Sequence, residues 1–320
     1  MKKRKAVRTK ATNGTVDGMP AEQQKSKTLK GTVLSVRRGV YRVESEDGGT
    51  VICRAASNPR KKSGRIIAGD RVEFAESGYG NGFITSLSER RNCFIRPPAA
   101  NVDQLVIVLS PKEPEPYFYN VDLLTVIARK CGAEAAIIVT KADLGGAGAI
   151  REIYRKAAIP VVVTSSKGNE GTDEAKKLLE GRISVICGAS GVGKSSLLNA
   201  VYPGVIEAET GTLSDRIKRG KNTTRVTELF PLGNGTYAAD TPGFSAVDTE
   251  LYCSIDYHDL YKYFPEFEAF TGDCRYGDCT HTKESECGIA QAVEKGLIAQ
   301  TRYESYKKLY YELKKINRYK

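Results

Sequence analysis

A glycine-rich segment in the middle of the chain constrains its fold more than any other feature. Residues 188–195 read G-A-S-G-V-G-K-S and fit the pattern G-x-x-x-x-G-K-[ST] at every fixed position. The apolar run 183–187 leads into it and residues 196–200 can continue as a helix, which is the strand–loop–helix context of a phosphate-binding loop. Lys194 would reach the β- and γ-phosphates, and Ser195 would ligate Mg²⁺. We therefore predict a nucleoside triphosphate site, rather than an ordinary glycine-rich turn, at Gly188, Ala189, Ser190, Gly191, Val192, Gly193, Lys194, Ser195 and Ser196.

Two short segments upstream of this loop predict which base the site binds. Residues 140–143 read T-K-A-D and follow an apolar strand, where GTPases carry N-K-x-D. The Asp143 carboxylate can accept hydrogen bonds from guanine N1–H and the exocyclic amino group, and adenine lacks those donors. Residues 164–167 follow another strand and resemble the S-A-K element that supports guanine O6. The predicted guanine-binding residues are Thr140, Lys141, Ala142, Asp143, Ser165, Ser166 and Lys167.

Downstream of the phosphate loop, two further segments complete the set. Residues 240–243 resemble D-x-x-G, in which Asp240 would hold Mg²⁺ through water and Gly243 would sense the γ-phosphate. Thr223 and Thr224 supply candidate switch hydroxyls. The predicted catalytic residues are Lys194, Thr223, Thr224, Asp240 and Gly243, and the predicted Mg²⁺ residues are Ser195, Thr223, Thr224 and Asp240.

The order of these segments is unusual. Ordinary GTPases run from the phosphate loop through the switch threonine and D-x-x-G to N-K-x-D and S-A-K. Here the last two come first, which is a circular permutation of the same sheet, and permutation is tolerated when the old termini lie close together at the surface.

A cysteine-rich segment near the C-terminus predicts a metal site. Cys274, Cys279, His281 and Cys287 have the spacing C-x4-C-x-H-x5-C, which gathers three of the eight cysteines and one of the two histidines. Three thiolates and one imidazole form a closed tetrahedral set of the kind that structural zinc prefers, with no open position for catalysis. The alternative is a chance cluster of reduced thiols. Five further cysteines are expected to be core thiols: Cys53, Cys93, Cys131, Cys187 and Cys253.

The remaining pattern predicts several domains. Residues 1–28 are polar and highly charged and are expected to be a disordered basic tail. Residues 29–98 contain short alternating runs bounded by turn residues and predict an OB-type β-barrel with a basic loop at 58–65, either an RNA-binding module or a structural spacer. Residues 99–252 alternate apolar strands with helices, which predicts a parallel doubly wound sheet. Residues 253–320 carry the metal motif, a short helix near His258 and a long helix from about Thr301, whose tyrosines and leucines form a packing face.

The charge distribution favours a polyanionic partner. The net charge is +11, and both ends are basic: +7 in residues 1–30, +5 in 31–98 and +5 in 288–320, around a middle region of −6. Clustered lysine and arginine attract nucleic-acid backbones, although a solvated tail and a lysine-rich surface helix explain the pattern equally well. No apolar run is long enough to cross a bilayer and no signal peptide opens the chain, so we expect a cytoplasmic protein.

Taken together, these motifs resemble the RsgA (YjeQ) family of circularly permuted GTPases over residues 29–320. The resemblance rests on T-K-A-D before G-A-S-G-V-G-K-S-S, on D-T-P-G-F and on the C-x4-C-x-H-x5-C module. It implies a monomeric GTP hydrolase that binds the small ribosomal subunit and its 16S rRNA late in assembly, with Mg²⁺ bound alongside GTP and one structural zinc. Two departures stand out: Thr140 replaces the Asn of N-K-x-D, and Asn222 stands where many members have a histidine.

These departures bear on the mechanism. With Phe244 after D-T-P-G and no switch histidine, no obvious side chain orients the attacking water, which predicts slow intrinsic hydrolysis accelerated by the ribosomal particle. A P-loop ATPase or nucleotide kinase is the alternative enzyme, and an RNA-binding adaptor with a degenerate nucleotide site is the alternative without catalysis.

Overall fold

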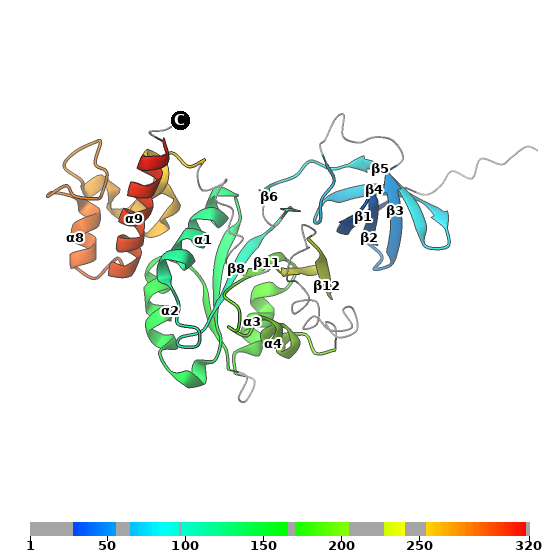
Figure 1. Cartoon of the computed structure of the whole chain (residues 1–320), viewed down its shortest axis with the longest axis horizontal. Helices are drawn as coiled ribbons and strands as arrows, with labels where there is room; N and C mark the ends of the chain where they lie inside the picture. The colour runs from blue at the N-terminus through cyan, green and yellow to red at the C-terminus, as the bar shows by residue number, and fades with distance from the viewer. Residues whose placement is uncertain are drawn as a thin grey trace, which may run out of the picture.

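Three parts of the chain lie one after another in this computed structural model: a small barrel, an α/β domain and a C-terminal helical module (Figure 1). The structure describes residues 28–55, 65–95, 98–165, 170–204, 227–240 and 254–317. The predicted basic tail, except for Thr28, and the basic loop, except for Arg65, lie outside these residues. Within the described part of the chain, no helix is long and apolar enough to span a membrane.

The N-terminal barrel is closed by five strands in the order β1-β2-β3-β5-β4. Burial alternates along β3 and along the first half of β4, because successive side chains of a strand point to opposite faces. The inward-facing residues, from Val33 on β1 to Ile84 on β5, fill the interior. The predicted OB-type barrel is therefore confirmed. Its strands are β1 (Thr28–Arg37), β2 (Val40–Ser45), β3 (Thr50–Ala55), β4 (Arg71–Gly78) and β5 (Asn81–Leu87).

A six-stranded sheet forms the centre of the molecule, in the order β10-β9-β8-β11-β13-β12. A short pair, β6 (Cys93–Ile95) and β7 (Pro98–Ala100), leads from the barrel into this sheet. Every neighbouring pair from β10 to β13 is parallel. The sheet strands are β8 (Gln104–Leu109), β9 (Glu134–Val139), β10 (Val161–Val163), β11 (Ile183–Cys187), β12 (Leu229–Gly233) and β13 (Thr236–Asp240).

Helices cover both faces of the sheet, as expected for a doubly wound domain. Alternate residues of β8 divide between the faces: Leu105 and Ile107 pack in the core with α1 and α2, whereas Val106 and Val108 pack with α3 and α4. Both faces of the strand are therefore buried, which explains its continuous apolar sequence. The helices are α1 (Phe118–Lys130), α2 (Ala147–Lys156), α3 (Thr172–Leu179) and α4 (Lys194–Val201).

The edge strand β12 departs from the predicted parallel sheet, because it pairs antiparallel with β13. The two strands are joined by a tight turn in which Asn234 and Gly235 have φ of 50° and 68°. An Asn-Gly pair of this kind forms the two-residue turns that match the twist of a β-hairpin. The sequence therefore contained a hairpin signal between the switch segments that the strand–helix pattern did not reveal.

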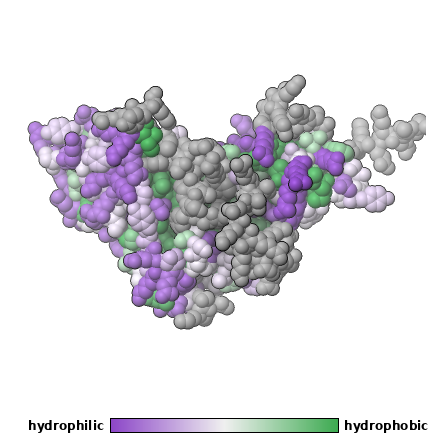
Figure 2. Space-filling model, viewed as in Figure 1, coloured by the Kyte–Doolittle hydropathy of each residue, from purple (hydrophilic) through white to green (hydrophobic). Residues whose placement is uncertain are grey.

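The C-terminal module packs its long helix against the α/β domain. The buried face of α9 (Gln300–Asn317) includes Tyr306, Leu309, Tyr310 and Leu313, which confirms the predicted packing face. The predicted short helix near His258 is present as a 3₁₀-helix, η4. The surface of this module is mostly hydrophilic in the view of Figure 2. The other elements are η4 (Tyr257–Tyr263), η5 (Pro265–Asp273) and α8 (Gly288–Glu294).

A buried charge network holds this module to the α/β domain. Arg302 of α9 donates from Nε and Nη2 to the Glu266 carboxylate at 2.7 and 3.1 Å. Its Nη1 donates to Asp122 Oδ1 at 2.9 Å and to Thr125 Oγ1 at 3.0 Å, both on α1. Tyr154 of α2 donates to the same oxygen of Asp122 at 3.0 Å. One guanidinium group therefore connects η5, α9 and α1 in the interior of the protein.

The remaining cysteines only partly follow the expectation of core thiols. Cys53 and Cys187 are buried and Cys131 is partly buried, whereas Cys93 is exposed. On the short strand β6 the next residue, Phe94, points into the core, so the alternation of the strand turns the Cys93 side chain outward. Cys253 lies outside the described residues.

Candidate functional site

The predicted nucleotide-binding segments meet at one edge of the sheet. The phosphate loop follows β11, T-K-A-D follows β9, and the segment that begins at Thr164 follows β10. Asp240 is the last residue of β13, where it pairs with Ile186 of β11. Because these strands are parallel, their carboxyl ends lie side by side, and this is the edge where open α/β sheets bind ligands.

The phosphate loop requires glycine at its first position. Gly188 has φ of +155°, and a Cβ built on it would lie 2.2 Å from the Val108 carbonyl oxygen of the neighbouring strand. Gly193, with φ of +96°, is the N-cap of α4. The chain therefore turns directly from a buried strand into a helix, whose free backbone N–H groups face the loop and favour an anion there.

The side chain of Lys194 lies across this loop. Its Nζ donates hydrogen bonds to the carbonyl oxygens of Gly188 at 2.9 Å and Ala189 at 3.1 Å. The ammonium group is therefore next to the backbone that would surround a phosphate. Ser195 and Ser196 follow in the first turn of α4, partly buried and exposed respectively.

Thr140 connects the predicted base-recognition segment, residues 140–143, to the phosphate loop. Its buried hydroxyl lies within hydrogen-bonding distance of the Val192 carbonyl oxygen and, at 3.2 Å, of the Leu109 carbonyl oxygen. The next residue, Lys141, has φ of 51°, and its Nζ donates to the Glu113 carbonyl oxygen at 2.6 Å. The ends of β8 and β9 and the phosphate loop are thereby held in one arrangement.

The two predicted guanine-binding segments touch each other. Ser165 Oγ donates to Asp143 Oδ1 at 3.1 Å, although the two residues are 22 positions apart. Asp143 belongs to a short 3₁₀-helix, η2 (Ala142–Leu144), and is exposed to solvent. A cavity of about 90 Å³ lies between these segments and α4, and its lining includes Thr140, Ser165 and Ser196. The Asp143 carboxylate is therefore accessible to a ligand at this edge.

Several predicted residues lie outside the described part of the chain. These are Ser166, Lys167, Thr223, Thr224 and Gly243, together with Asn222 and Phe244. For Asp240 the structure places the backbone at the carboxyl edge.

One part of the edge was missed at the sequence level. Ser110 follows β8 and is buried, and its Oγ accepts hydrogen bonds from the backbone N–H groups of Lys112 and Glu113 at 3.5 and 3.3 Å. This turn positions the carbonyl group of Glu113 that accepts from Lys141. The signal was available, because a polar residue directly after a buried parallel strand lies at the same edge as the phosphate loop.

The four predicted zinc ligands lie together in the C-terminal module. Their ligand atoms are all within 4.8 Å of one another. The His281 Nδ1 atom is 3.4 Å from the Cys274 sulfur and 3.6 Å from the Cys287 sulfur, and those two sulfurs are 4.0 Å apart. Tetrahedral zinc with normal bond lengths gives ligand separations of roughly 3.6 Å, so the residues fit this metal. The Gly288 N–H donates to the Cys274 sulfur at 3.3 Å, as in the outer shell of a thiolate site.

Burial shifts the pKa of two residues of this cluster towards their neutral forms. Burial raises the pKa of the Cys279 thiol to about 12 and lowers the pKa of His281. The adjoining loop is tied by Glu284, which accepts from Thr280 Oγ1 at 2.6 Å and from the Lys283 N–H at 3.1 Å. Burial raises the pKa of Glu284, but these hydrogen bonds outweigh burial and bring it to about 2.

Comparison with known proteins identifies the family. The model of the family described as RsgA GTPase matches residues 87–250. The small ribosomal subunit biogenesis GTPase RsgA of Moorella thermoacetica is 42% identical over 280 residues, which covers 87% of this chain and 95% of the relative. The Thermotoga maritima protein of the same name is 38% identical over 292 residues, covering 89% and 96%. The chain belongs to the RsgA GTPase family.

Solved structures of similar proteins agree with this RsgA fold. YjeQ from Thermotoga maritima is 36% identical with a TM-score of 0.76, and the match covers 90% of this chain and 99% of that one. YloQ, described as a circularly permuted GTPase, is 29% identical with a TM-score of 0.74, covering 92% and 97%. The arrangement of barrel, permuted α/β domain and C-terminal module is therefore that of the RsgA family, whose activity is GTP hydrolysis.

Proposed function

We propose that this chain is a Mg²⁺-dependent GTPase that assists late maturation of the small (30S) ribosomal subunit and binds its 16S rRNA. The observation that carries the proposal is the hydrogen bond between Ser165 and Asp143. It lies beside the phosphate loop, whose Val192 carbonyl oxygen accepts a hydrogen bond from Thr140. This arrangement joins a guanine-selective carboxylate to a triphosphate site. The names of the curated relatives supply the ribosomal role. We infer a cytoplasmic monomer.

The chemistry assigned to the site is attack of water in line with the γ-phosphate. Lys194 would neutralise charge that develops on the phosphate oxygens. Ser195, with Thr223 or Thr224, would hold Mg²⁺, and Asp240 would orient its bound water. Mg²⁺ supplies further charge stabilisation when it is bound. Gly243 would sense the γ-phosphate through its backbone.

The same proposal includes slow turnover in the free protein. Phe244 stands where Ras-like enzymes place the glutamine that positions water, and Asn222 replaces a switch histidine. The chain then depends on its partner to order the switches or to contribute a group. The zinc proposed at Cys274, Cys279, His281 and Cys287 is structural, because all four positions are filled by protein ligands.

The test is a GTPase assay with and without purified small ribosomal subunits, over a series of salt concentrations. We expect slow hydrolysis by the free protein, strong stimulation by the subunits, and loss of stimulation at high salt because the contacts involve RNA phosphates. Hydrolysis near 10 s⁻¹ by the free protein with no effect of subunits would contradict the proposal. Equal binding of ATP and GTP would instead favour an ATPase or kinase, and undetectable hydrolysis with subunits would favour an RNA-binding adaptor.

A further inference from the structure

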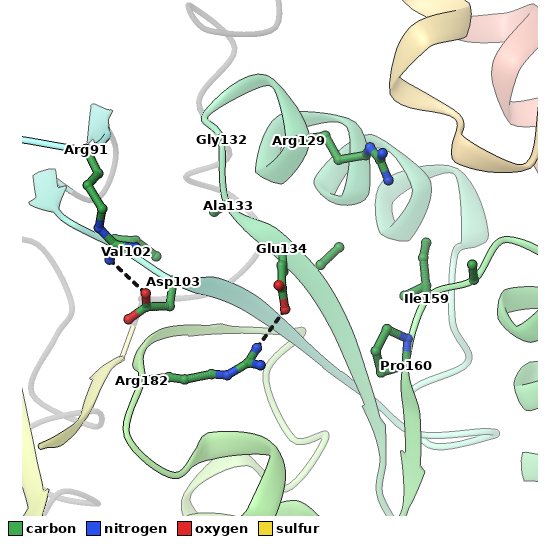
Figure 3. A pocket seen from close by; sticks show the side chains of 12 residues that line it. Arg91, Val102, Asp103, Arg129, Gly132, Ala133, Glu134, Ile159, Pro160 and Arg182 are labelled. Carbon is green, nitrogen blue, oxygen red and sulfur yellow. Dashed lines mark hydrogen bonds and ion pairs between the residues drawn. The ribbon is translucent and has the colours of Figure 1, made fainter. Parts of the chain in front are cut away.

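A second concave site lies at the amino edge of the sheet, opposite to the nucleotide site (Figure 3). This hollow has a volume of about 660 Å³ and is lined by the segments that lead into β8, β9, β10 and β11. Side chains around it include Arg91, Asp103, Arg129, Glu134 and Arg182. None of the predicted nucleotide-binding residues contributes to it. We call it the amino-edge pocket.

Two of the three arginines in this pocket are only partly engaged. Arg91 donates from Nη2 to Asp103 Oδ1 at 2.7 Å, and Arg182 donates from Nη1 to Glu134 Oε2 at 2.7 Å (Figure 3). Each guanidinium group uses a single terminal nitrogen for its contacts with the described residues. The pairs are partly exposed, with 64% of the Arg91 side chain and 39% of the Arg182 side chain accessible. Further donors therefore remain on both arginines.

The third arginine has no such engagement. Arg129, in the last turn of α1, is exposed, and its side chain forms no hydrogen bond or ion pair with any residue that the structure describes. Three guanidinium groups and two carboxylates leave the pocket with one excess positive charge, and each arginine has five N–H donors. The pocket therefore offers more donors than its own acceptors use.

Three backbone carbonyl groups of the pocket already accept hydrogen bonds from backbone N–H groups, and Arg91 Nη2 donates to one neighbouring carbonyl oxygen, that of Asn101, at 3.1 Å. The carbonyl oxygen of Asp103 accepts from the Glu134 N–H at 3.0 Å, and that of Pro160 accepts from the Ile137 N–H at 2.9 Å. The carbonyl oxygen of Arg129 accepts from the Gly132 N–H at 3.0 Å. The unmet capacity is thus on the guanidinium side, which suits a ligand rich in anionic oxygens, because arginine binds phosphate with two parallel hydrogen bonds.

The remaining lining distinguishes between phosphate-bearing ligands. The pocket has aliphatic walls, such as Val102, Ala133 and Ile159, and none of the described residues that line it is aromatic. Single-stranded bases are usually bound by stacking on aromatic rings. Without such a platform, the walls match the sugar and the arginines match the phosphates of an RNA backbone.

We propose that the amino-edge pocket binds the phosphodiester backbone of RNA, with Arg129 and Arg182 as its main phosphate contacts. The inference rests on the proposed function, since it names a surface that engages the ribosomal RNA. The position of the pocket supports it: Arg91 lies on the segment that leaves the barrel, and α1, which carries Arg129, packs against α9. In Figure 1 this edge of the sheet lies between the barrel and the C-terminal module, so an RNA that spans these two parts would pass it.

The test compares full-length Arg129→Gln and Arg182→Gln with the wild type in binding to small ribosomal subunits and to protein-free 16S rRNA. Arg151→Gln is the matched control, because Arg151 is exposed on α2 outside the pocket. We expect each pocket variant to bind small ribosomal subunits and protein-free 16S rRNA about tenfold more weakly than the wild type at low salt. The slope of log K against log salt should become shallower by about 0.7 to 0.9 for each variant. Arg129→Lys should keep the slope and lose only part of the affinity.

Other outcomes separate the inference from the proposed function. Pocket variants that bind both RNAs with the affinity and slope of the wild type overturn the inference, while wild-type stimulation by subunits would still support the function. If the pocket variants bind small ribosomal subunits more weakly but bind protein-free 16S rRNA as the wild type does, the pocket contacts a ribosomal protein, and the inference is also overturned. Competition by millimolar AMP would make it a small-ligand site. If the wild type binds 16S rRNA through the pocket but subunits do not stimulate hydrolysis, the proposed function fails alone.

Discussion

The buried guanidinium group of Arg302 gives the sharpest stability prediction for this protein. Arg302 is completely buried, and the side chains of its partners Asp122 and Glu266 are 1% and 2% exposed. In Arg302→Met, the new side chain fills similar space, but two carboxylates are left in the interior without a cation. Neither carboxylate can reach water without moving one of the packed helices α1 and η5 apart from α9.

The expected loss follows from the cost of an uncompensated buried charge. Breaking a buried ion pair by removal of one partner destabilises proteins by about 3–5 kcal/mol, which is a large part of a typical stability of roughly 5–15 kcal/mol. At a urea dependence of about 3 kcal/mol per molar, the unfolding midpoint should fall by about 1–1.7 M. The matched control is Arg155→Met, because Arg155 pairs with Glu152 at 2.9 Å on the surface, with 67% and 50% of their side chains exposed. We expect that control to lose less than about 1 kcal/mol.

The same network predicts the direction of a pH effect. Burial raises the pKa of Asp122 even though Arg302 lies beside it, and removal of Arg302 removes the nearest cation. A carboxylate whose folded-state pKa lies above its unfolded value destabilises the protein above that pKa, and the penalty is relieved as the pH falls through it. Arg302→Met should therefore lose less stability relative to the wild type at pH 5 than at pH 8.

The assay is urea unfolding followed by circular dichroism, since the chain has no tryptophan. Adding Glu266→Gln and Asp122→Asn to Arg302→Met should restore part of the lost stability, because the buried charges are then removed. The reasoning is refuted if Arg302→Met is no less stable than Arg155→Met, or if neutralising the two carboxylates makes the Arg302 variant weaker still.

Three further predictions concern the nucleotide and metal sites, one of them with a control substitution. Asp143→Asn should raise the Kd for GDP at least about 100-fold, measured by calorimetry, and should leave affinity for xanthosine diphosphate less affected because the amide can donate to its additional carbonyl. Gly188→Ala should abolish nucleotide binding, since the new Cβ would lie 2.2 Å from the Val108 carbonyl oxygen. Gly191→Ala is the control, because its new Cβ would meet no atom within 4 Å. That variant should lose only about 1–2 kcal/mol of stability, from the strain of an alanine at φ of +82°. Cys279→Ser should bind less zinc than the roughly one ion per chain expected of the wild type, and its melting temperature should be lower. Metal analysis and thermal unfolding measure these two effects. A wild-type protein that folds without bound metal would contradict the zinc proposal.

The gathering of the predicted nucleotide-binding segments at one edge could be read from the sequence because parallel sheets obey a simple geometric rule. Segments that follow apolar strands at residues 139, 163 and 187 all lie at the carboxyl edge, whatever their order along the chain. The metal cluster was predictable for another reason. Its ligands fall within fourteen residues, so local spacing alone brings them together.

Long-range polar contacts could not be predicted in this way. Arg302 belongs to a lysine-rich helix, and nothing in the sequence distinguishes it from the solvent-exposed cations of that helix. Its partner Asp122 is 180 positions away, in a helix of another domain. Nothing in either local pattern indicates that these charges are buried together. The amino-edge pocket was hidden for the same reason. Its arginines come from the end of α1 (Arg129) and from two segments that precede strands (Arg91 and Arg182), and these adjoin only after the sheet has formed.

Thr140 shows how the structure changes the meaning of a departure from a motif. By sequence, Thr140 is a departure from the Asn of N-K-x-D, and base selectivity is expected to rest chiefly on Asp143. In the structure the buried hydroxyl of Thr140 bonds the carbonyl group of Val192 in the phosphate loop, a contact that needs a short side chain with one donor. A larger amide in this buried position would have to displace either the loop or β8, because the hydroxyl is also 3.2 Å from the Leu109 carbonyl oxygen. The threonine therefore does not weaken the site; it holds the base-recognition segment and the phosphate loop at a fixed separation.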